Sequence, residues 1–329
     1  MTHKHAYLII VHKSINQLKL LLQLLDYPGN DIFIHVDKKA GISKEAIEEI
    51  KLQYTTTHVF KEIAVYWSDY SLCEAEILLL EKAISYSRKT GCEYNFLHLI
   101  SGLDLPLKTQ GQIHHFFAEH AGKEFVEYQT PKEHEPNSFY DRTRYYHILS
   151  KHYRKEGPFG KVISYCAVAC EYICLFPQIL FRVNRIPRDM EFARGSNWFS
   201  ITSDLAEFIL EKKEWIRKQY TLTRAGDESF VPMIVHNSKF REKLFMQSFN
   251  GDMHANMRFI DWSRGEPYVF RTSDYDELKK TDLLFARKFD IDIDSNIVEK
   301  VYSFVMENQK RELEDEVMEA EKPSSAFSC

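Results

Sequence analysis

The segment AYLIIVHKSINQLKLLLQLL (residues 6–25) decides how the amino-terminal third of the chain folds. Residues 6–11 form a continuous apolar run, which is typical of a strand buried on both of its faces. Ser14 and Gln17 follow at the spacing of a capping box, directly before the leucine-rich stretch LKLLLQLL. The segment therefore predicts a buried strand followed at once by a helix.

Three further strand patterns follow, and helix-start signals lie between and after them. The strands are DIFIHVD (31–37), THVF (57–60) and YNFLHLIS (94–101). The expected helix starts are Ser43, the capping-box pair Ser71 and Glu74, and the pair Thr109 and Gln112. Strands that alternate with helices in this way predict an α/β fold with a mostly parallel central sheet flanked by helices.

The length of the chain fits one large domain. Its 329 residues allow either two ordinary domains or one α/β domain with insertions, and we favour a single domain over residues 1–320. The strand and helix alternation stops over about 121–194, a basic and aromatic stretch that we interpret as an insertion, and an α/β pattern returns from 195. Residues 321–329 are expected to be a loose tail.

Charge and cysteine content exclude some classes of partner. A formal net charge of −5 argues against a general nucleic-acid binder, because such proteins bind through a basic face that releases counterions from phosphates. Six cysteines without a C-x-x-C pair indicate reduced structural thiols rather than a zinc site. The first strand pattern begins almost at once, without a leader-like segment, so we expect a cytoplasmic protein.

Residues 162–181, VISYCAVACEYICLFPQILF, are mostly apolar and are flanked by Lys and Arg. They are long enough for a transmembrane helix, but Glu171 and Pro177 interrupt the run. Two alternatives are a buried core helix and an interfacial helix whose flanking cations suit anionic headgroups. The segment is thus a candidate for peripheral contact with the inner face of a membrane.

Polar residues follow the predicted strands, at the edge where an open α/β sheet binds its ligand. Those residues are His12 to Ser14, His35 to Asp37 and Gly102 to Asp104. The common phosphate and dinucleotide signatures, G-x-x-x-x-G-K-[ST] and G-x-G-x-x-G, are absent. Their absence disfavours a phosphate-binding kinase or a dinucleotide oxidoreductase.

Six motifs in the same order make the chain similar to one enzyme family. They are YWSDYSLCEAEILLLEKAI, FLHLISGLDLPLKT, GSNWFSIT, AGDESFVPMIVHNS, MRFIDW and LLFARKFD. Together they resemble the core 2 and I-branching enzymes, the β-1,6-N-acetylglucosaminyltransferases of glycosyltransferase family 14. That family also includes peptide O-xylosyltransferases and plant glucuronosyltransferases, and the resemblance runs from about residue 6 to 300.

The resemblance implies a GT-A-like nucleotide-sugar fold and an inverting transferase that works without a metal or other cofactor. Asp37 matches the family residue that contacts the uridine, and Glu228 matches the catalytic base. Arg258 and Lys288 match the two cations that grip the diphosphate of the donor, which we expect to be UDP-N-acetylglucosamine. The sequence departs from the animal enzymes in the middle third, where acceptor contacts are expected, and lacks their anchor and paired cysteines. We therefore expect a bacterial-type cytoplasmic member acting on a glycan or lipid-linked glycan.

Elementary chemistry is consistent with that site. Inverting transfer by one displacement needs a base for the acceptor hydroxyl and positive charge for the departing diphosphate. One carboxylate is enough for the base, and Arg and Lys side chains are able to replace a metal ion as the positive charge.

Several alternatives stay open at this point. Sugar transferases built on such a sheet often hold a metal with a D-x-D pair, and HVDKK (35–39) has only Asp37. Asp290, Asp292 and Asp294 do place carboxylates at alternate positions, although capping of the following helix and surface solvation are the uses that we favour. A metal-dependent transferase, transfer of xylose or glucuronate, and a silent nucleotide-sugar-binding or glycan-binding module are the remaining hypotheses.

Overall fold

The computed structural model describes residues 4–129, 139–153, 155, 157–247 and 253–320, so the expected tail 321–329 lies outside the described residues. In this part of the chain a five-stranded sheet has the order β3-β2-β1-β4-β6. The bounds are β1 Lys4–Val11, β2 Asn30–Val36, β3 Thr56–Phe60, β4 Tyr94–Ser101 and β6 Ser200–Ile201. The pairs β1–β2, β1–β4 and β2–β3 are parallel, and only the short β6 is antiparallel to its neighbour among these strands.

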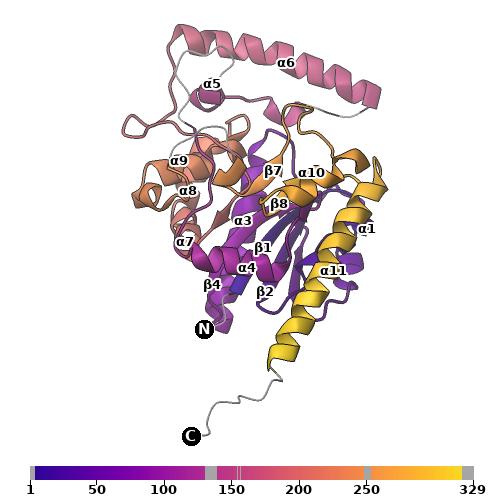
Figure 1. Cartoon of the computed structure of the whole chain (residues 1–329). Helices are drawn as coiled ribbons and strands as arrows, with labels where there is room; N and C mark the ends of the chain where they lie inside the picture. The colour runs from indigo at the N-terminus through magenta and orange to yellow at the C-terminus, as the bar shows by residue number, and fades with distance from the viewer. Residues whose placement is uncertain (1–3, 130–138, 154, 156, 248–252, 321–329) are drawn as a thin grey trace, which may run out of the picture.

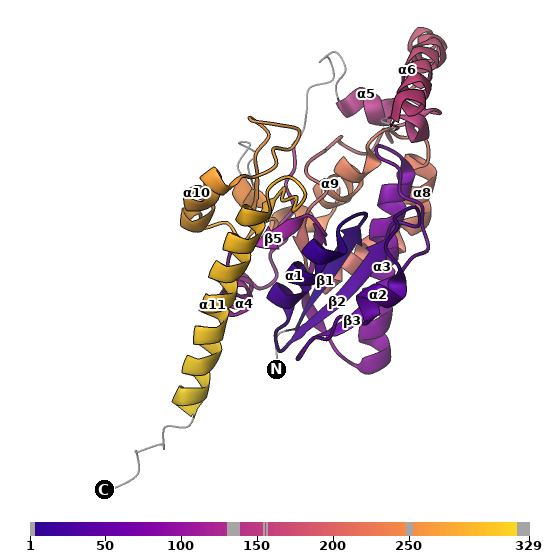
Figure 2. The ribbon, with the colours of Figure 1, turned by 90° about the vertical axis from the view of Figure 1, so that its right-hand side faces the viewer.

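Helices cover both faces of this sheet, as Figure 2 shows for α3 on one side and α1 and α11 on the other. The helices are α1 Ile15–Leu25, α2 Lys44–Glu48, α3 Tyr70–Thr90, α4 Gln110–Glu119, α5 Phe139–Arg144, α6 Gly157–Leu180, α7 Ser203–Glu211, α8 Lys213–Tyr220, α9 Phe230–His236, α10 Tyr275–Lys280 and α11 Ser295–Ala320. The predicted α/β class with a mostly parallel, helix-flanked sheet is confirmed, and the arrangement is GT-A-like.

Alternate residues of β1 explain the two-sided core. Ala6 and Leu8 belong to the cluster that includes residues of α3, α7 and α9. Tyr7 and Ile9 belong to the cluster that includes residues of α1, α4 and α11. All four side chains are fully buried, because successive side chains of a strand point to opposite faces and both faces are covered.

A second, smaller sheet lies beside the first and carries part of the site. Its order within the described residues is β5-β8-β7, with β5 Asp104–Pro106, β7 Arg258–Ile260 and β8 Phe285–Arg287. β8 is antiparallel to β5 and parallel to β7. The chain enters β5 only two residues after β4 ends, so β8 is held near the carboxyl end of the main sheet.

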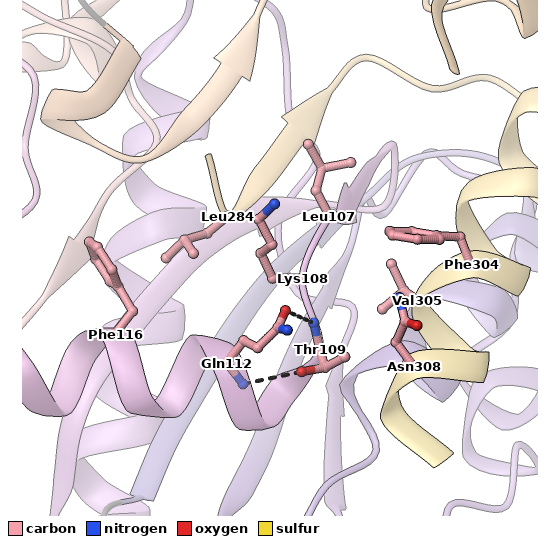
Figure 3. Close-up of a pocket in the computed structure, with 9 residues that line it drawn as sticks. All are labelled: Leu107, Lys108, Thr109, Gln112, Phe116, Leu284, Phe304, Val305 and Asn308. Atoms are coloured by element: carbon pink, nitrogen blue, oxygen red, sulfur yellow. Dashed lines mark hydrogen bonds between the residues drawn. The ribbon is translucent and has the colours of Figure 1, made fainter. Parts of the chain in front are cut away.

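The predicted helix caps are confirmed at three places and wrong at one. The side chains of Ser14 and Ser43 cap α1 and α2, and Thr109 forms a reciprocal capping box with Gln112 at the start of α4 (Figure 3). The expected cap at Ser71 is wrong. The helix α3 begins at Tyr70, and the Asp69 carboxylate accepts the Ser71 N–H at 3.1 Å.

The apolar segment 162–181 forms most of α6, which lies along the outside of the molecule beyond α5 (Figure 1). Among the described helices, α6 is the one that is long and apolar enough to cross a membrane. Only 11% of its most apolar 18-residue stretch is buried in the protein. The alternative of a buried core helix is therefore wrong.

Candidate active site

The predicted site residue Asp37 and one residue of the expected ligand edge, His12, follow strands of the main sheet. Asp37 comes directly after β2 and is 7% exposed. Its Oδ1 atom accepts the backbone N–H groups of Lys39 at 2.9 Å and Val65 at 3.2 Å. His12 comes directly after β1. Both residues therefore lie at the edge where the carboxyl ends of the parallel strands meet.

Three cations lie beside this edge. They are Lys13, which follows His12, Arg287 at the end of β8, and Lys288 directly after it. Lys13 donates to Asp290 at 2.5 Å, and Arg287 donates to Asp104 at 2.6 Å, so both are paired with carboxylates. The Nζ atom of Lys288 has no hydrogen bond or salt bridge with any residue that the structure describes. Partial burial and the charge of Arg287 lower the pKa of Lys288. An unpaired, partly desolvated ammonium group at a ligand edge is suited to bind an anion.

His12 lies within electrostatic range of charges from both strand ends. Partial burial lowers that pKa first, the charges of Lys288, Arg287 and Lys13 lower it further, and Asp37 raises it. One imidazole thus responds to a carboxylate at the end of β2 and to cations at the end of β8. Asp37 and Lys288 are therefore brought within electrostatic range of one imidazole.

Arg258 lies behind this group. Its side chain is 2% exposed, and its Nη2 atom donates to the carbonyls of Leu99 at 3.2 Å and Phe199 at 2.5 Å and to Ser200 Oγ at 3.1 Å. Burial lowers its pKa to about 9, so the guanidinium stays charged at neutral pH. These bonds connect β7 to β4 and β6. To contact a donor phosphate, the guanidinium has to break some of these hydrogen bonds. Its diphosphate role stays a prediction.

Glu228 ends the short 3₁₀ segment Gly226–Glu228, before α9. Its side chain is 31% exposed, yet its Oε2 atom is shielded from solvent and accepts no hydrogen bond from the described residues. Nη1 of Arg142 lies 3.9 Å from that oxygen. Burial raises the pKa of Glu228, and the charges of Arg142, Arg194 and Arg224 oppose the rise. A carboxylate with a raised pKa and an oxygen that accepts no hydrogen bond is equipped to accept a proton.

Two neighbouring acids differ from Glu228 because they are buried. Asp227 is 7% exposed, and burial and the charge of Glu228 raise its pKa to about 8. Glu76 of α3 is fully buried, and burial and Asp227 raise its pKa well above the usual range. Burial therefore favours the protonated form of Asp227 and Glu76 more strongly than that of the partly exposed Glu228.

One short loop, residues 195–198, connects the carboxylate group to the cation group. The N–H of Gly195 donates to the carbonyl of Glu228 at 2.7 Å. Three residues later the ring of Trp198, 7% exposed, lies 4.5 Å from the Arg287 guanidinium. The loop thus contacts both groups and links Glu228 to the cations.

The three acids at alternate positions after β8, Asp290, Asp292 and Asp294, lie in different surroundings. Asp290 is buried and pairs with Lys13, and Asp292 is exposed. Asp294 accepts the N–H of Thr272 at 2.8 Å and that of Ile297 in the first turn of α11 at 3.2 Å. These contacts support capping for Asp294. Within the described residues no group of three or more His, Cys, Asp or Glu side chains is arranged to hold a metal ion.

A pocket of about 370 Å³ lies away from these groups, between β5, α4 and α11 (Figure 3). Its lining residues are Leu107, Lys108, Thr109, Gln112, Phe116, Leu284, Phe304, Val305 and Asn308. Gln110, beside it on α4, bonds to Asn30 at the first residue of β2. The pocket is thus near the amino ends of the strands and contains none of the predicted site residues.

Comparison with known proteins supplies the family. The family model described as Core-2/I-Branching enzyme matches residues 5–283. The chain belongs to this family. The matched range includes Asp37, Glu228 and Arg258, and Lys288 lies just beyond its end.

Curated relatives include xylosyltransferases of animals. The chain is 22% identical over 312 residues to xylosyltransferase 2 of Canis lupus familiaris, which covers 89% of this chain and 33% of the relative. It is 24% identical over 324 residues to xylosyltransferase sqv-6 of Caenorhabditis briggsae, covering 92% of this chain and 36% of the relative. The chain thus spans about a third of the length of these relatives. The solved apo structure of mouse xyloside xylosyltransferase 1 aligns with 86% of this chain and 96% of its own, at a TM-score of 0.37 and 11% identity.

Sequence reasoning did not find the arginines around Glu228. Arg142 lies on α5, Arg194 precedes β6 and Arg224 precedes the 3₁₀ segment, so three separated stretches supply them. The basic and aromatic character of the region 121–194 was a signal for Arg142 and Arg194, whereas Arg224 lies outside that region. Arg287, directly before Lys288, pairs with Asp104 at 2.6 Å.

Proposed function

We propose that this chain is an inverting glycosyltransferase that moves a sugar from a UDP-sugar to a hydroxyl of a glycan. Glu228 removes the proton of the acceptor hydroxyl. The observation that carries the proposal is the Oε2 atom of Glu228, which lacks a hydrogen bond and lies beside Arg142 while the acids behind it are buried. A general base placed in this way typically contributes about 10²–10⁴-fold to the rate.

On the donor side, Lys288 and Arg287 face the diphosphate, and Asp37 orients the uridine. Arg258 also binds the diphosphate when its guanidinium gives up a hydrogen bond to a backbone carbonyl and donates to a phosphate oxygen instead. Each charge-assisted bond to phosphate contributes about 1.5–3 kcal/mol. Fixed cations of this kind stabilise the leaving group without a metal ion. The paired state of Arg287 with Asp104 leaves Lys288 as the main donor-binding cation.

Two donors have support from similar proteins. The resemblance to the β-1,6-N-acetylglucosaminyltransferases favours UDP-N-acetylglucosamine, and the xylosyltransferases among the relatives favour UDP-xylose as the second candidate. Their sugars differ by a hydroxymethyl group and an acetamido group, so a site shaped for one discriminates against the other. The acceptor is a glycan or lipid-linked glycan, and the enzyme acts in the cytoplasm.

The test combines a donor panel with two isosteric variants. Purified protein is assayed with UDP-N-acetylglucosamine, UDP-xylose and UDP-glucuronate, with hydrolysis as the readout where no acceptor is known. We expect Glu228→Gln to lower turnover at least about 100-fold while UDP still binds. Asp227→Asn mimics an acid that is already protonated, so we expect it to keep most activity. Equal losses in both variants would remove Glu228 as the base, and UDP binding without turnover of any donor would favour a silent binding module.

A further inference from the structure

Helix α6 places its polar side chains against the protein. Ser164, Glu171 and Gln178 recur every seven residues, which puts them on one side of the helix. The Ser164 hydroxyl accepts the N–H of Lys155 at 2.9 Å, and the Glu171 carboxylate accepts the N–H of Leu149 at 3.2 Å. The Gln178 side chain accepts the backbone N–H of Tyr146 and donates to the carbonyl of Tyr146, a residue that follows α5. The inward face of α6 is therefore its polar face.

The outward face is apolar, which is the reverse of an ordinary surface helix. Its most exposed side chains are Phe159 (79%), Tyr165 (76%), Ile173 (72%), Phe176 (69%), Tyr172 (64%) and Leu180 (64%). Soluble proteins rarely expose a contiguous apolar surface of this kind unless it contacts a membrane or another protein. Figures 1 and 2 both show α6 as the outermost element at its end of the molecule.

The contacts show that α6 lies along the body of the protein and does not project from it. Its 24 residues make a helix about 36 Å long. Ser164 bonds to Lys155 just before the helix, Glu171 holds the middle of the helix to Leu149, and Gln178 holds its last turns to Tyr146. After the helix, Arg185 donates to the carbonyls of Tyr145 and Leu222, each at 3.0 Å. A helix whose middle and last turns are held to the protein in this way lies along the protein surface and does not stand across a hydrocarbon layer about 30 Å thick.

The charges around the apolar face match an anionic lipid surface. Exposed Lys161 and Arg182 lie near the two ends of α6. The only acid in the helix, Glu171, is 3% exposed and faces inward, 2.9 Å from His147. Tyrosines such as Tyr165 combine an apolar ring with a polar tip, which suits the depth of lipid headgroups.

We propose that α6 docks this protein onto an anionic lipid bilayer, with the helix axis parallel to the membrane plane. The apolar face enters the boundary between headgroups and acyl chains, and the terminal cations bind anionic headgroups. Arg142 of α5 lies 3.9 Å from Glu228, and the segment after α5 holds α6 through Gln178. The docked face is thus joined to the acceptor side of the site. This last consequence rests on the proposed function, whereas the docking does not.

The test measures vesicle binding of the full-length protein, which requires no turnover. Co-sedimentation is compared for vesicles of phosphatidylcholine alone and of phosphatidylcholine mixed with phosphatidylglycerol. We expect the protein to bind the mixed vesicles and to be released by alkaline carbonate. Ile173→Glu should weaken binding at least about tenfold, because it removes an aliphatic side chain that enters the bilayer and adds a charge. Lys161→Gln and Arg182→Gln should each weaken it roughly fivefold.

The matched control is Tyr54→Glu, which adds the same charge at an exposed residue (46%) away from α6, and it should bind vesicles as the parent does. Far-ultraviolet circular dichroism and thermal unfolding confirm that each variant is folded. Equal vesicle binding by Ile173→Glu and the parent would overturn the proposal, as would retention in alkaline carbonate, which marks a spanning helix. The proposal would also be overturned if the parent protein does not bind vesicles but forms a dimer that Ile173→Glu abolishes. That result would assign the apolar face to contact with a second copy of the chain.

Discussion

The backbone N–H of Gly195 donates to the carbonyl of Glu228 at 2.7 Å, and this bond joins the two halves of the candidate active site. Three residues after Gly195, the Trp198 ring lies against Arg287 of the cation group. The proposed base and the proposed leaving-group cations are therefore positioned by one loop. A change in that loop should disturb both halves at once.

Gly195→Ala tests the loop. A Cβ atom at this position would lie 1.8 Å from the carbonyl oxygen of Glu127, a backbone atom that has little freedom to move. We expect a loss of about 1–3 kcal/mol in the free energy of unfolding and a strong fall in turnover. Thermal unfolding and a transfer assay measure the two effects. Gly41→Ala is the control, since nothing lies within 4 Å of its added Cβ, and equal behaviour of both variants would refute the proposed role of the loop.

Lys288→Ala should weaken UDP binding by roughly 10–100-fold, because one charge-assisted bond to phosphate is lost. Binding of uridine, which carries no phosphate, should stay the same. Titration calorimetry with both ligands measures the difference, and Lys280→Ala serves as an exposed control. If UDP and uridine weaken equally, Lys288 acts on the fold of the site and not on the diphosphate.

Arg142→Gln should change the pH dependence of turnover. The base must be ionised, so kcat/KM rises as the pH passes upward through the pKa of Glu228. Burial already raises that pKa, and Arg142 lowers it, so removal of the cation should move the acid limb to higher pH. Activity should fall severalfold on the acid side and recover at higher pH, which a purely structural defect would not do. Arg217→Gln, at an exposed arginine of α8, should leave the profile unchanged.

Turnover should continue in excess chelator, because fixed cations take the place of a metal on the donor diphosphate. The measurement is the initial rate with and without EDTA, followed by addition of Mn²⁺ or Mg²⁺. Activity that disappears with chelator and returns with metal would instead support the metal-dependent alternative.

The sequence alone determined the layers of the fold. Continuous apolar runs such as residues 6–11 are unambiguous because a strand covered on both faces needs apolar residues at every position, and caps such as Thr109 act within one turn of chain. The cap of α3 was missed because Asp69 and Ser71 are both good caps, and only the chain geometry before Tyr70 selects Asp69.

Only the tertiary structure decided which residues share the site and which way α6 faces. Arg142, Arg194 and Arg224 come from three separate segments, and no local pattern requires them to meet Glu228. Arg258 stands in a family motif, yet its burial follows from long-range contacts with β4 and β6. The composition of α6 fits a core helix equally well. The apolar face points outward because Glu171 and Gln178 form hydrogen bonds with the rest of the protein on the opposite side of the helix. The partners of these two side chains are distant in sequence, so no local pattern reveals them.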